Sequence, residues 1–331
     1  MNATIAGLRL TLEDGTDLAA KINPRHVSLT LTEKRGGEAD ELHITLQNAD
    51  GALAIPSKGQ ILRLAIGWIS GEEVTPGLVD KGRFRVDEVS ASGPPDIITL
   101  SARSADFTGA YHRRRNHTWR GTTLGAVLSA IAARHGITAQ VHPDLAAKPI
   151  ASAEQHGKSD MAFVRDLGSR FDALATWKDR RLVFMPIGSA TNARGQKIPA
   201  LTITRREGWQ WTYTHAQRDE HDGAQAQWHD AGTGKRRTVS TGGENPKRLK
   251  RTYASEAEAH QAAKAEAAKR KRGGKSFEYD LALADMRIMP NGRITLSGWA
   301  STITGLSWLV ESVELTLAAQ GLRQKVKLEA G

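Results

Sequence analysis

The chain has 331 residues, of which 39% are hydrophobic and 25% are charged, and its formal net charge is +10. This length predicts two or three domains, and the composition is that of an ordinary globular protein. With no cysteine, the chain cannot form a disulfide framework, a thiolate metal site or a cysteine nucleophile. The sequence shows neither a secretory signal nor a run of 18 apolar residues, so we expect no stable membrane insertion.

Residues 1–105 carry short stretches in which apolar and polar side chains alternate, for example Leu29 and Leu31, then Leu42, Ile44 and Leu46. This period of two is typical of strands with one buried face. Glycine-rich turns separate the stretches. The pattern predicts a first β-barrel domain.

Residues 106–200 predict a small mixed α/β domain. One helix is expected to begin after a cap at Thr122 and to end at Gly136, and a second to begin near Ser159. Two strands follow, 174–177 and 182–185, joined by a turn. The basic excess of the chain lies in this domain and in the part that follows it.

Residues 201–331 predict a second β-barrel domain of similar size, with an inserted loop and helix at 242–274. The strand pattern includes 209–215 and 224–230 and resumes at 276. The stretch 232–248 is polar and glycine-rich and is interpreted as a mobile loop. The helix should have a capping box of Ser255 and Glu258, an ion pair of Glu266 with Arg270, and its end at Gly273. The expected fold class is therefore mainly β, with two tube-like barrels, a small α/β domain and an inserted helix.

The sequence shows no recognisable catalytic, cofactor or metal site. His215, His221 and His229 lie among Asp219, Asp222 and Asp230, but their strand spacing favours a row of side chains over a cage. Gly234-Lys235 lacks the other residues of a phosphate loop. The sequence predicts no catalytic residue and no cofactor.

Two aromatic and basic clusters are candidate interfaces. Arg113, Arg114 and Arg115 with Trp119 could bind single-stranded nucleic acid, but a wet protein interface, which we favour, uses the same residue types. Trp209, Trp211 and Tyr213 could form a carbohydrate or base platform, although an aromatic strand face is more often core or subunit contact.

The order of these parts resembles the phage late control D family of baseplate hub proteins, which is similar to the hub part of type VI secretion spike proteins. The resemblance covers nearly the whole chain and is carried by GKSDMAFVRDLGSRFDALATWKDRRLVFMP, by KRKRGG before a strand, and by LSWLVESVELTLAAQGLRQKVKLEA. These are structural patterns, and no catalytic residue transfers with them.

The resemblance implies a structural, non-enzymatic protein in the tail baseplate of a contractile phage or a phage-tail-like, bacteriocin-like particle, assembled in the bacterial cytoplasm. It implies a homotrimer that joins the hexameric tail tube protein to the trimeric tail spike protein and meets baseplate and tape-measure proteins. We expect the needle to be a separate polypeptide, since the chain ends directly after the last predicted strand.

The alternative hypothesis is a basic nucleic-acid-binding or late-gene regulatory protein. A regulator should gather its positive charge on a recognition helix or stripe. Here the basic residues are spread over loops, a helix end and strand edges, so we expect no specific nucleic acid partner.

Overall fold

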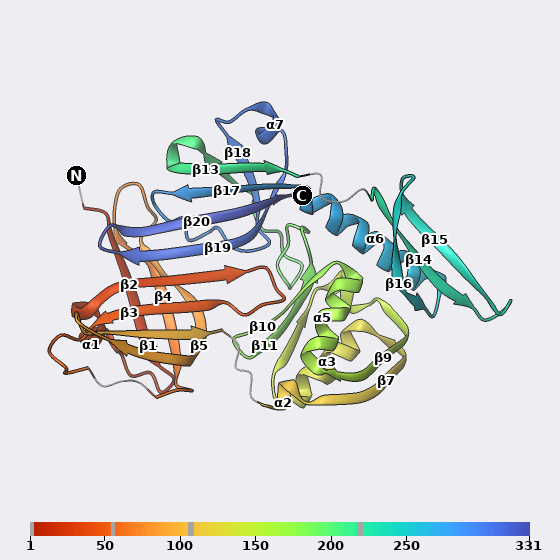
Figure 1. The fold of residues 1–331 in the computed structure, drawn as a ribbon, viewed down its shortest axis with the longest axis horizontal. Helices are drawn as coiled ribbons and strands as arrows, with labels where there is room; N and C mark the ends of the chain where they lie inside the picture. The colour runs from red at the N-terminus through yellow and green to blue at the C-terminus, as the bar shows by residue number, and fades with distance from the viewer. Residues whose placement is uncertain (1–2, 54–56, 105–108, 217–220) are drawn as a thin grey trace.

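The computed structural model describes residues 3–53, 57–104, 109–216 and 221–331. The fold is mainly β with few helices, as the sequence predicts (Figure 1). The largest part is a sheet of twelve strands, beside which lie a small α/β domain and a separate module of three strands and a helix. None of the described helices is both long and apolar enough to cross a membrane.

The first half of the large sheet contains six strands in the spatial order β1-β4-β5-β6-β3-β2. Alternation of apolar and polar residues gives each strand one buried face, on which Leu29, Leu31 and Leu42 are fully buried. The elements are β1 (Ile5–Leu12), α1 (Ala19–Ile22), a 3-10 turn (Asn23–Arg25), β2 (His26–Lys34), β3 (Glu41–Gln47), β4 (Ile61–Ser70), β5 (Gly77–Ser92) and β6 (Ile97–Arg103).

The second half also contains six strands, in the order β12-β18-β19-β20-β17-β13. When the strands of each half are numbered along the chain, both orders are 1-4-5-6-3-2, so the strand order is repeated. One difference is that β12 runs parallel to β18, whereas β1 runs antiparallel to β4. The elements are β12 (Leu201–Thr204), a 3-10 turn (Arg205–Glu207), β13 (Gly208–His215), β17 (Lys275–Leu281), β18 (Arg293–Ser297), α7 (Ser301–Thr304), β19 (Trp308–Ala318) and β20 (Gly321–Ala330).

The two halves are joined by antiparallel pairing of β2 with β19, from Ser28 opposite Ala318 to Lys34 opposite Ser312. Figure 1 shows the continuous layer from β13 through β17, β20 and β19 to β2 and β3. One hydrophobic core runs under both halves. Within the described residues, the strand pairing does not close either half into the predicted barrel. The edge strand of the first half, β2, pairs with β19 and so continues the sheet into the second half.

The small α/β domain has a ribbon of β7 and β9 and a sheet of order β10-β11-β8. Both predicted helices are present, and Ser159 caps the second through its side chain. Thr123 caps the first, one residue after the predicted Thr122. The elements are α2 (Gly109–His112), β7 (Arg114–Thr123), α3 (Leu124–Arg134), β8 (Thr138–Val141), α4 (Pro143–Ala146), β9 (Pro149–Ser159), α5 (Asp160–Phe171), β10 (Ala173–Lys178) and β11 (Arg181–Pro186).

The inserted module is larger than the sequence analysis predicted. It contains β14 (Gly223–Asp230), β15 (Lys235–Gly242), β16 (Pro246–Tyr253) and α6 (Glu256–Gly273). The prediction that 224–230 belongs to the second β domain is wrong, because β14 pairs with β15 and β16 instead. The prediction of a mobile loop over 232–248 is also wrong, because most of this stretch forms β15 and the start of β16.

The composition of the module explains why β15 and β16 were taken for a loop. The contact between β14 and α6 is made by Ala224 and Ala226 of the strand with Ala259 and Ala263 of the helix, all fully buried. The other strands are polar and largely exposed. In β15 and β16 only Val239, Leu249 and Tyr253 belong to the packed cluster, so these two strands lack the regular alternation of large apolar side chains by which a strand is recognised.

Candidate assembly interfaces

In the arginine cluster, Arg114 and Arg115 begin β7, which pairs with β9, and Arg113 directly precedes this strand. Arg113 and Arg114 are exposed, and Arg115 is only partly exposed. The Nε atom of Arg115 lies 3.4 Å from an Oδ atom of Asp160, whose side chain is fully buried at the start of α5. Only part of the predicted interface is therefore free to meet a partner.

Asp160 is the centre of a polar network that the sequence analysis missed. Its carboxylate lies 3.1 Å from Nη1 of Arg134 and 2.9 Å from Nε2 of His135, and it accepts a hydrogen bond of 2.8 Å from Nε2 of Gln155. Buried charges require such partners, because an unpaired carboxylate loses its hydration at high cost. Arg115 is thus a structural residue of this domain.

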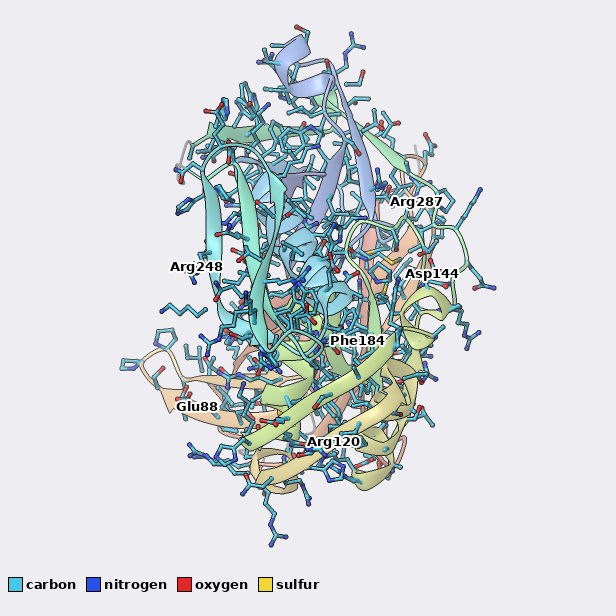
Figure 2. The ribbon with its side chains drawn as sticks, turned by 90° about the vertical axis from the view of Figure 1, so that its right-hand side faces the viewer. Glu88, Arg120, Asp144, Phe184, Arg248 and Arg287 are labelled. Carbon is cyan, nitrogen blue, oxygen red and sulfur yellow. The ribbon has the colours of Figure 1, made fainter. Side chains whose placement is uncertain are left out.

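Trp119, like Arg115, packs mainly within the small α/β domain. Its ring is partly buried against the domain core, and the guanidinium of Arg134 lies 5.2 Å from the ring centroid. Arg120, on the same strand, is exposed at the surface of the molecule (Figure 2). The exposed part of β7 is accordingly basic without a free aromatic platform, which weakens the case for single-stranded nucleic acid.

The aromatic cluster lies on β13, which pairs only with β17 among the described strands and is therefore an edge. Trp209 is 51% exposed and Trp211 is 36% exposed, whereas Tyr213 is partly buried against the main core. Trp211 stacks on Phe277 with a centroid distance of 6.0 Å, and Tyr213 packs on the edge of Trp308. These three residues form an apolar edge on the large sheet.

Each exposed tryptophan also lies under an arginine. The guanidinium of Arg323 is 5.0 Å from the ring centroid of Trp209, and that of Arg205 is 5.5 Å from Trp211. Such cation–π contacts restrain the rings. In Figure 1, β13 lies near the top of the molecule and β7 near the bottom, so the structure does not bring the two candidate interfaces together.

The metal hypothesis, which the sequence already disfavoured, gains no support. In the part of the chain that the structure describes, no three side chains of His, Cys, Asp or Glu are placed to hold a metal ion. His215 ends β13, while His229 and Asp230 belong to β14 in another sheet. Asp219 lies outside the described residues.

A buried ion cluster joins the first half of the sheet to the small domain. This junction cluster consists of Glu33, Asp40, Lys81 and Lys178, with N to O distances of 2.6 Å for Lys81–Glu33, 3.2 Å for Lys178–Glu33 and 2.6 Å for Lys178–Asp40. Burial alone would raise the pKa of Glu33, but the two lysines outweigh it and hold that pKa below its ordinary value. Burial does raise the pKa of Asp40, against the opposing charge of Lys178.

Ion pairs also fix the inserted module. Arg170 of α5 and Glu258 of α6 are both buried and lie 2.7 Å apart. Arg272, in the basic end of α6, pairs with Asp172 of the small domain and lies 3.1 Å from Glu329 of β20. These partners of Arg272 lie on other elements and could not be read from local spacing.

Comparison with known proteins agrees with this architecture. The family model for the phage tail baseplate hub (GPD) matches residues 26–321. A probable baseplate hub protein of Escherichia phage 186 is 32% identical over 362 residues, which cover 97% of this chain and 92% of that protein. The 43 kDa tail protein of prophage MuSo2 from Shewanella oneidensis has a similar fold, with a TM-score of 0.69, 14% identity and 98% of each chain covered.

A component of the type VI secretion system of E. coli, described as similar to the tail proteins gp27 and gp5 of phage T4, shares the fold more distantly. Its TM-score is 0.55 at 14% identity, over 93% of this chain and 74% of the other. The fold and the relatives thus define a structural component of phage-type tails. The chain belongs to the phage tail baseplate hub family. The regulatory alternative finds no support in these comparisons.

Proposed function

We propose that this protein is the non-enzymatic hub of a contractile phage tail or tail-like particle, where three copies form a ring between the hexameric tail tube and the trimeric central spike. The observation that carries the proposal is the repeated strand order of the two halves. Each half then acts as one tube-like unit of the ring.

Symmetry gives the physical reason. A ring of three chains with two similar units each presents six similar positions to a sixfold tube and keeps exact threefold symmetry for the spike. A ring of six identical chains would offer six equal positions and would leave the threefold partner mismatched. The internal repeat therefore suits a protein that lies between the two symmetries.

We assign the surfaces by their chemistry. The ring contacts involve the edge strands of the large sheet, including the aromatic edge of Trp209, Trp211 and Tyr213. The exposed arginines Arg113 and Arg114 face other baseplate or tape-measure proteins, since arginine is enriched in wet protein interfaces. No specific nucleic acid and no stable membrane insertion belong to this role.

An image of the assembled tail at subunit resolution tests the proposal. We expect three copies of the chain around the axis, between tube and spike, with both halves of each chain at the same height. A hub ring of any other order, or tails that contain no copy of the chain, would refute it.

A further inference from the structure

The two halves of the large sheet can be aligned residue by residue. A bulge interrupts the pairing of β5 with β6 between Val86 and Glu88, and another interrupts the pairing of β19 with β20 between Val310 and Ser312. Val86 lies opposite Ala102, and Val310 lies opposite Leu328. The two bulges therefore make Val86 equivalent to Val310.

The equivalence extends across the sheet to the edges. In the first half, Ala102 pairs with Leu42, and Leu42 pairs with Leu31 of β2. In the second half, Leu328 pairs with Phe277, and Phe277 pairs with Tyr213 of β13. Both edge strands also have a register shift just before this point. Strand β13 is therefore the counterpart of β2, with Tyr213 in the place of Leu31.

Inside the chain, the edge of one half already binds the other half. Leu31 of β2 lies opposite Leu315 of β19, and both are fully buried. On that side of β19, β18 pairs with Trp308 and Leu309, and β2 pairs with the strand from Ser312 onward. The junction is thus formed by the second strand of the first half, β2, and the later part of the fifth strand of the second half, β19, when the strands of each half are counted along the chain.

The counterparts of both junction strands are open. Strand β4 pairs with β5 only up to Arg85, so the stretch Glu88–Ser92 of β5 pairs only with β6 among the described residues. Ala91, the counterpart of Leu315, is exposed. Glu88 marks this outer part of β5 at the edge of the molecule in Figure 2. On the other open strand, Trp211 is 36% exposed, whereas its counterpart Leu29 is fully buried.

We propose that β13 of one copy pairs antiparallel with the open part of β5 of a second copy, with Tyr213 opposite Ala91 and His215 opposite Val89. This register repeats that of the internal junction, where Leu31 lies opposite Leu315. The proposal rests on the hub function proposed above and deepens it, because it names the partner and the register of the aromatic edge.

Two physical arguments favour a second copy as the occupant. The two halves are similar units that meet head to tail through the β2–β19 junction. A rotation that repeats this contact places the first half of a second copy against β13 of the first copy. The new pairing also satisfies the backbone groups of two exposed edges, which are otherwise sites of uncontrolled association.

Side-chain size supports the same register. Tyr213 faces Ala91, and Trp211 meets Gly93, the first residue of the turn that follows β5. At the internal junction both places are filled by pairs of leucines, Leu31 with Leu315 and Leu29 with Leu317. A large ring opposite a small residue in each new pair keeps the interface filled.

Disulfide cross-linking in assembled tails tests the register, because the chain has no cysteine of its own. The in-register variant is Thr214→Cys with Ser90→Cys. Its matched control is Thr32→Cys with Glu314→Cys, the same position at the internal junction, where the two residues lie directly opposite. An offset control, Thr214→Cys with Ala91→Cys, places the two thiols on opposite faces of the sheet.

After mild oxidation, we expect the in-register variant to run on a non-reducing gel as linked dimers and trimers. The matched control should form a bond within one chain, and the offset control should form none. A second in-register pair, Thr212→Cys with Ser92→Cys, replaces the first if that variant fails to assemble; its matched control is Thr30→Cys with Thr316→Cys.

The register would be overturned if tails contain the hub ring and the matched control forms its bond within one chain, but the in-register variant gives no link between chains. That result would leave the hub function intact. Equal linking by the offset pair would overturn it as well. Tails that lack the chain, or that hold a ring of another order, would refute the proposed function itself.

Discussion

Removing the carboxylate of Glu258 should loosen the inserted module from the small domain. Glu258 lies 2.7 Å from Arg170, and the two side chains are 8% and 5% exposed. The change Glu258→Gln leaves the guanidinium of Arg170 buried beside a neutral amide. Breaking a buried pair from one side costs about 3–5 kcal/mol, since the remaining charge has lost both its hydration and its partner.

This cost falls on the contact between α5 and α6, so it should appear as local opening. Because 1.4 kcal/mol corresponds to a factor of ten, amides of α6 that exchange when the module undocks should exchange roughly 100 to 4,000 times faster. Hydrogen exchange with residue-level resolution measures this directly, and it avoids the assumption that a chain of several parts unfolds in one step.

A matched surface change provides the control. Glu278 and Lys325 lie 3.5 Å apart and are 40% and 47% exposed. Glu278→Gln should cost only about 0–1 kcal/mol, because water screens an exposed pair. If the Glu258 variant changes exchange in α6 no more than the Glu278 variant, the Arg170–Glu258 pair does not hold the module in place.

Three further predictions concern charge. The folded-state pKa of Glu33 in the junction cluster lies below its ordinary 4.5, so the stability it supplies is present above that pH and is lost as the pH falls through the folded-state pKa. The difference in unfolding free energy between the wild type and Glu33→Gln should therefore narrow on acidification, as measured by urea titration between about pH 7 and pH 3. Asp40, whose pKa is raised, acts with the opposite sign, and it is present in both proteins. A difference that stays constant with pH would contradict the assignment of Glu33. Arg114→Ala should change the free energy of unfolding by less than about 0.5 kcal/mol, measured by thermal denaturation. Arg115→Ala, which removes a partner of Asp160, should lower the free energy of unfolding by about 1 kcal/mol, and equal effects of the two changes would argue against the network. Binding to duplex DNA should be weak, independent of sequence and strongly reduced between about 50 and 200 mM salt in a fluorescence titration, and a footprint on one site that survives physiological salt would contradict the structural role.

The sequence predicted those parts of the fold in which large side chains alternate or caps are local. Leu29, Leu31 and Leu42 identify strands because one buried face requires apolar residues at every second position. Ser159 identifies the start of α5 because a helix needs an acceptor for its first amides. The helix of the inserted module was placed in the same way, from Ser255 to Gly273.

The capping box at that helix formed only in part. The side chain of Ser255 accepts a hydrogen bond from the amide of Glu258, as predicted, but the carboxylate of Glu258 pairs with Arg170 instead of returning to the cap. The buried guanidinium of Arg170 competes more strongly for this carboxylate than a backbone amide at the helix start. Local spacing cannot show such a competitor.

The candidate interfaces were predictable as residues but not as surfaces. The run of Arg113, Arg114 and Arg115 looks uniform in the sequence, yet only Arg115 reaches the buried carboxylate of Asp160. The aromatic residues of β13 were expected to share a strand face, but a register shift between Gly208 and Trp211 interrupts the alternation. Trp211 and Tyr213 pack on the core residues Phe277 and Trp308, whereas Trp209 lies under the exposed Arg323. That this strand is an edge depends on the strand order, which brings together segments far apart in the chain.

The inserted module occupies the position of a short turn. In the first half, β2 passes to β3 through residues 35–40, whereas in the second half the corresponding connection, from β13 to β17, contains β14, β15, β16 and α6. In the proposed ring, arms would therefore project from every second unit, 120° apart. Such arms give neighbouring proteins a way to tell the two kinds of unit apart, so a part that docks against an arm can take only three of six orientations around the axis.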